Sequence, residues 1–79
     1  MTRDEIVFRL NKTFRNVFKD PSLIVKDELT AKDVDGWDSL SHMILLNEIE
    51  EEFNLKFRLK EISKMENVGD LISIIINKL

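Results

Sequence analysis

The fold is decided by the stretch Asp35-Gly36-Trp37-Asp38-Ser39-Leu40-Ser41-His42-Met43, where an acidic connection runs into an amphipathic helix. Asp38 is suited to cap that helix, because its carboxylate can accept a backbone N–H from the first turn. Apolar residues then recur at helical spacing, and the expected core stripe consists of Leu45, Leu46, Ile49 and Phe53. We therefore predict a helix over residues 39–53, with Asp38 as its N-cap.

A first helix is predicted to begin at Thr2. Thr2 and Glu5 have the spacing of a capping box, in which each side chain accepts the other residue's backbone N–H. The helix should end at Asp20-Pro21, because proline disfavours the helical conformation in the residue before it. Its apolar stripe consists of Ile6, Val7, Leu10, Phe14, Val17 and Phe18.

Residues 19–38 form a long connection, which is unusual in a compact domain and often functional. We expect five apolar residues to hold it against the core: Leu23, Ile24, Val25, Leu29 and Val34.

The C-terminal third predicts one short and one longer helix. Residues 54–57 form a connection with two apolar anchors, and a short helix over 59–64 turns Ile62 inward. Asn67 is a good N-cap for the last helix. That helix has a β-branched run, but a lone strand would have no partner. We predict an all-α, four-helix bundle of three longer helices and one short helix, forming a single domain over residues 1–79.

The composition excludes several classes of protein. The chain has no cysteine, which excludes disulfides, thiolate metal sites and any protein thiol that could hold a thioester. No apolar run is long enough to span a bilayer, and the charged N-terminus lacks the features of a signal peptide. We expect a cytoplasmic, soluble monomer without membrane contact.

Charge is distributed unevenly along the chain. Residues 20–52 carry two basic and ten acidic residues, a net charge of −8, whereas the chain as a whole has −3. Such a segment should repel nucleic acid and attract basic protein surfaces, although a merely solvated polar face is the alternative.

One metal motif can be rejected. Asp33-Val34-Asp35-Gly36 is similar to part of an EF-hand calcium loop, but Ala31 and His42 then occupy its first and twelfth positions. The charged first ligand and the bidentate glutamate are therefore both missing, and we expect no bound metal.

The sequence around Ser39 resembles the prosthetic-group attachment site of acyl carrier proteins. The resemblance extends over the whole chain, through the segments Ile49-Glu50-Glu51-Glu52-Phe53, Glu61-Ile62 and Asn67-Val68-Gly69-Asp70. It implies that Ser39 carries a covalent 4′-phosphopantetheine arm, whose thiol holds acyl groups as thioesters. It also implies that Asp38 helps to hold the magnesium ion of the modifying phosphopantetheinyl transferase.

Such a protein is a carrier and not an enzyme, so no catalytic residue is expected. Its partners would be the transferase and the enzymes, with basic surfaces, that load and transfer acyl groups. We expect them to contact Leu40, Met43, Ile44, Asn47, Glu48 and Glu51. We interpret Trp37 as an anchor for the loop and His42 as a surface residue.

Carriers of central fatty acid synthesis usually have acidic residues where this chain has Ser41 and Ile44. The chain looks more like the stand-alone carriers of specialised pathways. An aminoacyl or peptidyl carrier, of the D-alanyl or nonribosomal type, is an alternative. A helical interaction module without a prosthetic group is another.

Overall fold

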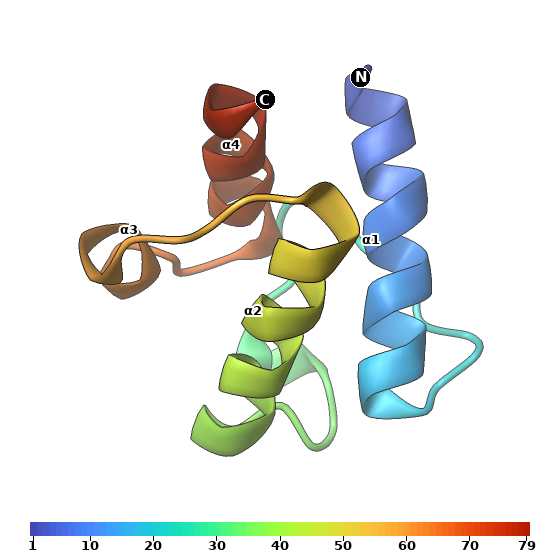
Figure 1. Cartoon of the computed structure of the whole chain (residues 1–79). Helices are drawn as coiled ribbons and strands as arrows, with labels where there is room; N and C mark the ends of the chain where they lie inside the picture. Colours follow the sequence, from blue (N-terminus) through green and yellow to red (C-terminus); the bar gives the residue numbers. More distant parts are fainter.

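The computed structural model describes residues 1–79 and consists of helices and their connections (Figure 1). Its elements are α1 (Arg3–Phe18), a 3₁₀ turn η1 (Ala31–Asp33), α2 (Ser39–Phe53), α3 (Leu59–Ser63) and α4 (Val68–Lys78). The predicted all-α fold with three longer helices and one short helix is confirmed. None of the four helices has the combination of length and apolar character that a membrane span requires.

Helix α1 begins with the predicted capping box. The Thr2 N–H donates to Glu5 Oε1 at 3.1 Å, and the Glu5 N–H donates to Thr2 Oγ1 at 3.2 Å. The helix stops at Phe18, so the connection begins at residue 19 as predicted, although Lys19 and not Asp20-Pro21 forms the end of the helix. Lys19 takes a left-handed conformation with φ of 53° and donates its N–H to the Arg15 carbonyl. This bond closes the last turn of α1 two residues before Pro21.

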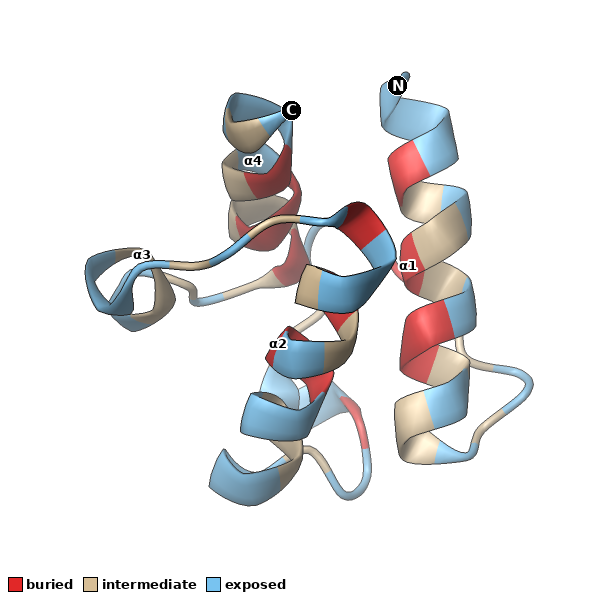
Figure 2. Ribbon diagram, in the orientation of Figure 1, coloured by how far each residue is buried: buried red, intermediate tan, exposed pale blue.

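The core lies where α1, α2 and α4 face one another, and Figure 2 shows their buried residues on these inner faces. Helix α1 runs antiparallel to both α2 and α4 (Figure 1). The expected stripe of α2 is buried as predicted. The core cluster consists of Ile6, Leu10, Phe14, Val25, Leu45, Leu46, Ile49, Phe53, Val68, Leu71, Ile72 and Ile75.

The long connection is held by polar contacts as well as by apolar side chains. The Val25 N–H donates to Asn11 Oδ1 at 2.7 Å, and Arg15 Nε donates to the Leu23 carbonyl at 2.7 Å. Val25 and Val34 are buried, and Leu23 and Leu29 pack against the core. The expectation for Ile24 is wrong, since it is 59% exposed.

The same connection is tied to the start of α4. The N–H groups of Val68 and Gly69 donate to the carbonyls of Leu29 and Asp27, both at 2.9 Å. A Cβ on Gly69 would lie 3.3 Å from the Asp27 carbonyl oxygen, so a larger residue would crowd this junction. The junction brings the connection, α2 and the beginning of α4 to one end of the bundle.

Two short segments complete the fold. In α3, Glu61 Oε1 accepts the Arg58 N–H at 2.7 Å and lies 2.9 Å from Lys78 Nζ of α4. Ile62 faces the core as predicted, and Asn67 Oδ1 caps α4 by accepting the Asp70 N–H at 2.9 Å.

Candidate functional site

The start of α2 is a fully formed capping box. Asp38 Oδ1 accepts the Ser41 N–H at 2.9 Å, and Ser41 Oγ accepts the Asp38 N–H at 2.8 Å. The bond from the Ser41 N–H, with a further contribution from the Ser41 side chain, favours the ionised carboxylate and lowers the pKa of Asp38 below its ordinary value. The predicted N-cap is therefore confirmed, and it fixes the direction in which α2 leaves the loop.

The two serines of this helix start differ in what their hydroxyls do. Ser41 is half-buried, and its hydroxyl donates to the Gly36 carbonyl at 2.6 Å in addition to its role in the capping box. Ser39 is exposed, and none of the hydrogen bonds at this helix start uses its hydroxyl. A modifying enzyme could reach the Ser39 hydroxyl without dismantling the cap.

Trp37 holds the loop against α1. Its ring lies 5.4 Å from that of Phe14 in an edge-to-face arrangement and 5.6 Å from that of Phe18. Such aromatic pairs add to the stabilisation that burial gives. The interpretation of Trp37 as an anchor is confirmed.

His42 is not the simple surface residue that the sequence suggested. Trp37 Nε1–H donates to His42 Nδ1 at 3.0 Å, and the two rings stack with their centroids 6.0 Å apart. The imidazole is half-buried, and this burial lowers the pKa of His42. The spacing of Trp37 and His42 across a helix start was the only signal in the sequence, and periodicity alone does not reveal it.

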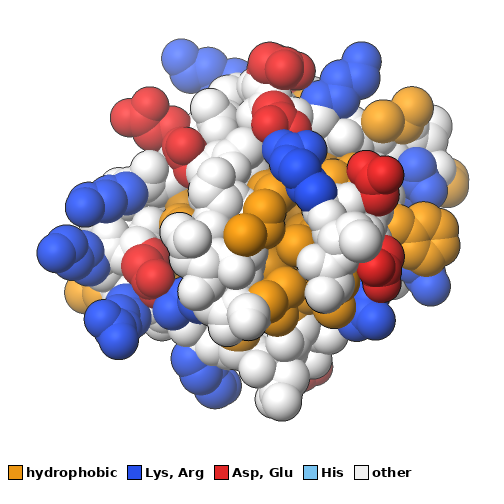
Figure 3. Space-filling view, turned by 90° about the horizontal axis from the view of Figure 1, so that it is seen from above, with side chains coloured by type: hydrophobic (Ala, Val, Ile, Leu, Met, Phe, Trp, Pro, Cys, Tyr) orange, Lys and Arg blue, Asp and Glu red, His pale blue; other side chains and the backbone are white.

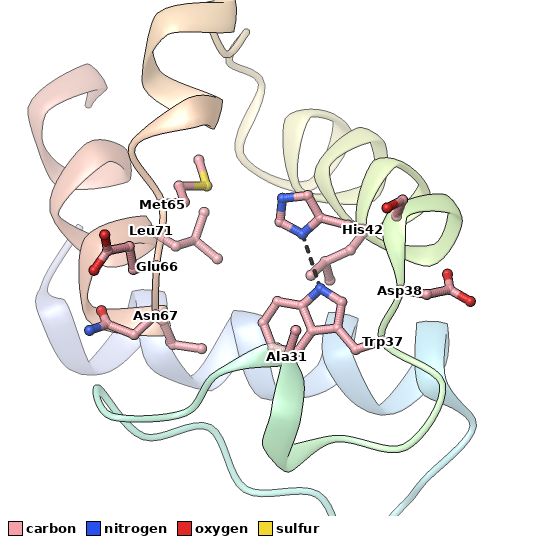
Figure 4. A pocket seen from close by; sticks show the side chains of 11 residues that line it. Ala31, Trp37, Asp38, His42, Met65, Glu66, Asn67 and Leu71 are labelled. Carbon is pink, nitrogen blue, oxygen red and sulfur yellow. Dashed lines mark hydrogen bonds between the residues drawn. The ribbon is translucent and has the colours of Figure 1, made fainter.

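A pocket of about 390 Å³ lies beside this pair, between α2 and the segment that leads into α4 (Figure 4). Both Asp38 and Ser39 line it, so the exposed hydroxyl stands at a partly apolar hollow. The sequence did not predict the contribution of residues 65–71. The lining consists of Ala31, Trp37, Asp38, Ser39, His42, Leu45, Met65, Glu66, Asn67, Val68 and Leu71.

These residues fit a phosphopantetheine group. The phosphodiester would be an anion at the first turn of α2, where free N–H groups and the helix dipole favour negative charge. The pocket offers apolar side chains to the methylene groups of an attached chain. A pocket of this size is within the usual range for small-ligand sites, roughly 300–1,000 Å³.

Beyond the cap, α2 presents an apolar outer face. Leu40, Met43 and Ile44 are 73%, 56% and 48% exposed. Asn47 and Glu51 are also exposed, and Glu48 is half-buried. Because these positions are separated by three or four residues in turn, they form one continuous strip along the helix.

No group of three His, Cys, Asp or Glu side chains is placed to hold a metal ion. In the loop that is similar to an EF-hand, Asp33 Oδ2 accepts the Thr30 N–H at 2.9 Å and so caps η1.

Among solved structures, the holo acyl carrier protein from Geobacter metallireducens, determined by solution NMR, is similar to this chain. The two are 43% identical and superpose with a TM-score of 0.86, over 91% of this chain and 83% of that one. A Mycobacterium tuberculosis protein, provisionally named an acyl carrier protein, superposes with a TM-score of 0.78 over 96% and 97% of the two chains. At 21% identity it supports the fold alone. No protein-family model and no curated protein sequence matches the chain.

Proposed function

This chain belongs to the acyl carrier protein family, and we propose that it carries acyl groups as thioesters on a phosphopantetheine arm attached to Ser39. The observation that carries the proposal is the free, exposed Ser39 hydroxyl on the first residue of a capped helix. The chain has no cysteine, so the arm supplies the thiol on which the cargo is held.

Each residue of the helix start has a part in this function. The Ser39 hydroxyl oxygen would form a bond to the pantetheine-bearing phosphorus of coenzyme A and lose its proton, while the pyrophosphate bond breaks and adenosine 3′,5′-bisphosphate leaves. Asp38 would keep the first turn of α2 in place, and one of its oxygens would help to hold the transferase's magnesium ion. Trp37 would keep the attachment site close to α1 through its contacts with Phe14 and Phe18.

The partner surface is proposed to be the outer strip of α2. Leu40, Met43 and Ile44 supply apolar contact area, and methionine adapts well to partners of varied shape. Asn47, Glu48 and Glu51 extend the strip with polar and acidic groups. Enzymes with basic surfaces would be steered to it by charge.

A specialised pathway is proposed over central fatty acid synthesis. The two positions at which central carriers usually have acids are occupied by Ser41 and Ile44. Ser41 is committed to the capping box, and Ile44 is exposed, so neither supplies the usual charge to a partner. We also propose that residues 1–79 act as one carrier domain, since one core cluster joins α1, α2 and α4.

The test uses the intact mass of the apo protein after incubation with coenzyme A, magnesium and a broad-specificity phosphopantetheinyl transferase. The wild type should gain one phosphopantetheine, and Ser39→Ala should gain none while remaining folded by circular dichroism. Ser41→Ala is the matched control, since it removes the neighbouring hydroxyl and should still be modified. Modification of Ser39→Ala, or failure of the wild type to react, would contradict the proposal.

A further inference from the structure

The Trp37–His42 pair is a fixed part of the pocket wall beside Ser39. The indole is held by Phe14 and Phe18, and its N–H reaches His42 Nδ1 at 3.0 Å. The imidazole is thus anchored through Trp37 to the core-facing side of α1. A side chain that only filled surface space would have no such support.

This hydrogen bond decides which ring nitrogen of His42 carries the proton. The indole N–H can only donate, so His42 Nδ1 must be an unprotonated acceptor. In the neutral ring the proton therefore lies on Nε2. Burial lowers the pKa of His42, which favours this neutral form at pH 7.

The protonated nitrogen faces the pocket. In Figure 4 the second ring nitrogen of His42 lies away from Trp37, on the side of the ring that faces Met65. No side chain or carbonyl of the protein accepts a hydrogen bond from it. An N–H donor is thus available in a pocket whose other walls include the apolar residues Leu45, Val68 and Leu71.

We propose that His42 Nε2–H donates a hydrogen bond to a carbonyl oxygen of the chain attached at Ser39, which makes His42 a positioning residue for arm and cargo. The proposal rests on the proposed function. An isolated donor among apolar groups suits an uncharged acceptor on an otherwise aliphatic chain. A carboxylate is disfavoured there, because the acidic residues Asp38 and Glu66 line the same pocket.

The first test concerns the apo protein and needs no attached group. The ¹⁵N shifts of the two ring nitrogens, read by NMR through the carbon-bound ring protons, report the position of the proton. We expect the wild type to be protonated at Nε2. Trp37→Phe keeps an aromatic ring but removes the N–H donor to Nδ1, so the Nδ1 shift should change and the share of rings protonated at Nδ1 should rise. Protonation at Nδ1 in the wild type, or the same ring signals in both proteins, would overturn the proposal.

The second test follows the same signals when the arm and cargo are present. Apo, holo, butanoyl-holo and 3-oxobutanoyl-holo proteins are compared, each after its intact mass has confirmed the attached group. A change in the Nε2 shift that is already present in the holo form assigns the acceptor to an amide carbonyl of the arm. A change that appears first with butanoyl assigns it to the thioester carbonyl, and one seen only with 3-oxobutanoyl assigns it to the cargo's 3-oxo group.

Two negative results can be told apart. Unchanged Nε2 shifts in all three loaded forms would overturn the role of His42 while leaving the carrier function intact. A wild-type chain that gains no arm would overturn the carrier function, and this proposal with it, and the mass measurement reveals that before any ring signal is recorded.

Discussion

At the scale of single residues, neighbouring side chains at the start of α2 differ in the hydrogen bonds that they make. The Ser41 hydroxyl makes contacts with Asp38 and Gly36, whereas the Ser39 hydroxyl makes none at this helix start. The structure also shows that His42 accepts a hydrogen bond from Trp37, which explains its fixed position. The sequence could predict the cap, because it depends on residues within one turn. It could not predict the state of His42, which depends on the hydrogen bond from Trp37 and on the partial burial of the ring.

The pKa of His42 predicts how stability should depend on pH. Burial lowers this pKa in the folded state, so the unfolded chain binds a proton more readily. The stabilisation is fully present above the unfolded value, about 6.5. It is lost as the pH falls from there through the lower folded pKa.

The check is to measure the free energy of unfolding in urea from pH 7.5 to pH 5, for the wild type and for His42→Gln. The wild type should lose more stability than His42→Gln over this range, because only the wild type has the imidazole. The carboxylates that also titrate in this range are present in both proteins, so they do not affect the comparison. Equal pH dependence of the two unfolding free energies would contradict the lowered pKa of His42.

At the scale of elements, helix starts were more predictable than the connection between helices. The caps at Thr2, Asp38 and Asn67 are local features and follow from the sequence. The connection is held by contacts between distant residues, such as Asn11 with Val25. Ile24 remains in solvent within this connection, an outcome that local patterns do not reveal.

Two isoleucines of α2 should differ in how much stability is lost when each is replaced by alanine. Ile49 is fully buried, whereas Ile44 is 48% exposed on the outer strip. Ile49→Ala should therefore cost about 2–5 kcal/mol of stability, and Ile44→Ala less than about 1.5 kcal/mol. Only Ile44→Ala should also reduce turnover by the cognate loading enzyme, and this loss should be larger than the loss of folded protein explains. Denaturant melts in which both changes are equally damaging would show that Ile44 belongs to the core.

At the scale of the whole molecule, acidic and basic residues are unevenly distributed along the chain. The middle segment that contains α2 has a net charge of −8. Seen from above, Lys and Arg side chains gather on the side of the molecule where α3 lies (Figure 3). The exposed basic residues of that region are Lys56, Arg58, Lys60 and Lys64. This asymmetry gives approaching partners a preferred orientation.

The acidic segment over residues 20–52 predicts that the transferase modifies the protein less efficiently at high salt. Ionic strength screens exposed charges over a Debye length of about 8 Å at 0.15 M, so steering of a basic transferase by α2 should fade. Transferase efficiency toward the apo protein should fall between low and high salt, measured with coenzyme A at saturation. A control series with Glu48→Gln/Glu51→Gln should show a shallower fall. A flat response in the wild type would reduce the acidic segment to a solvated face.

The most direct test of the central claim is mass spectrometry of the protein purified from its own host. We predict the mass of one phosphopantetheine, with or without an acyl group, and fragmentation that places it on Ser39. An acyl group released by hydroxylamine would identify the cargo. An arm on any other residue, or a chain that is unmodified in its host and stays unmodified with coenzyme A and transferase, would contradict the account.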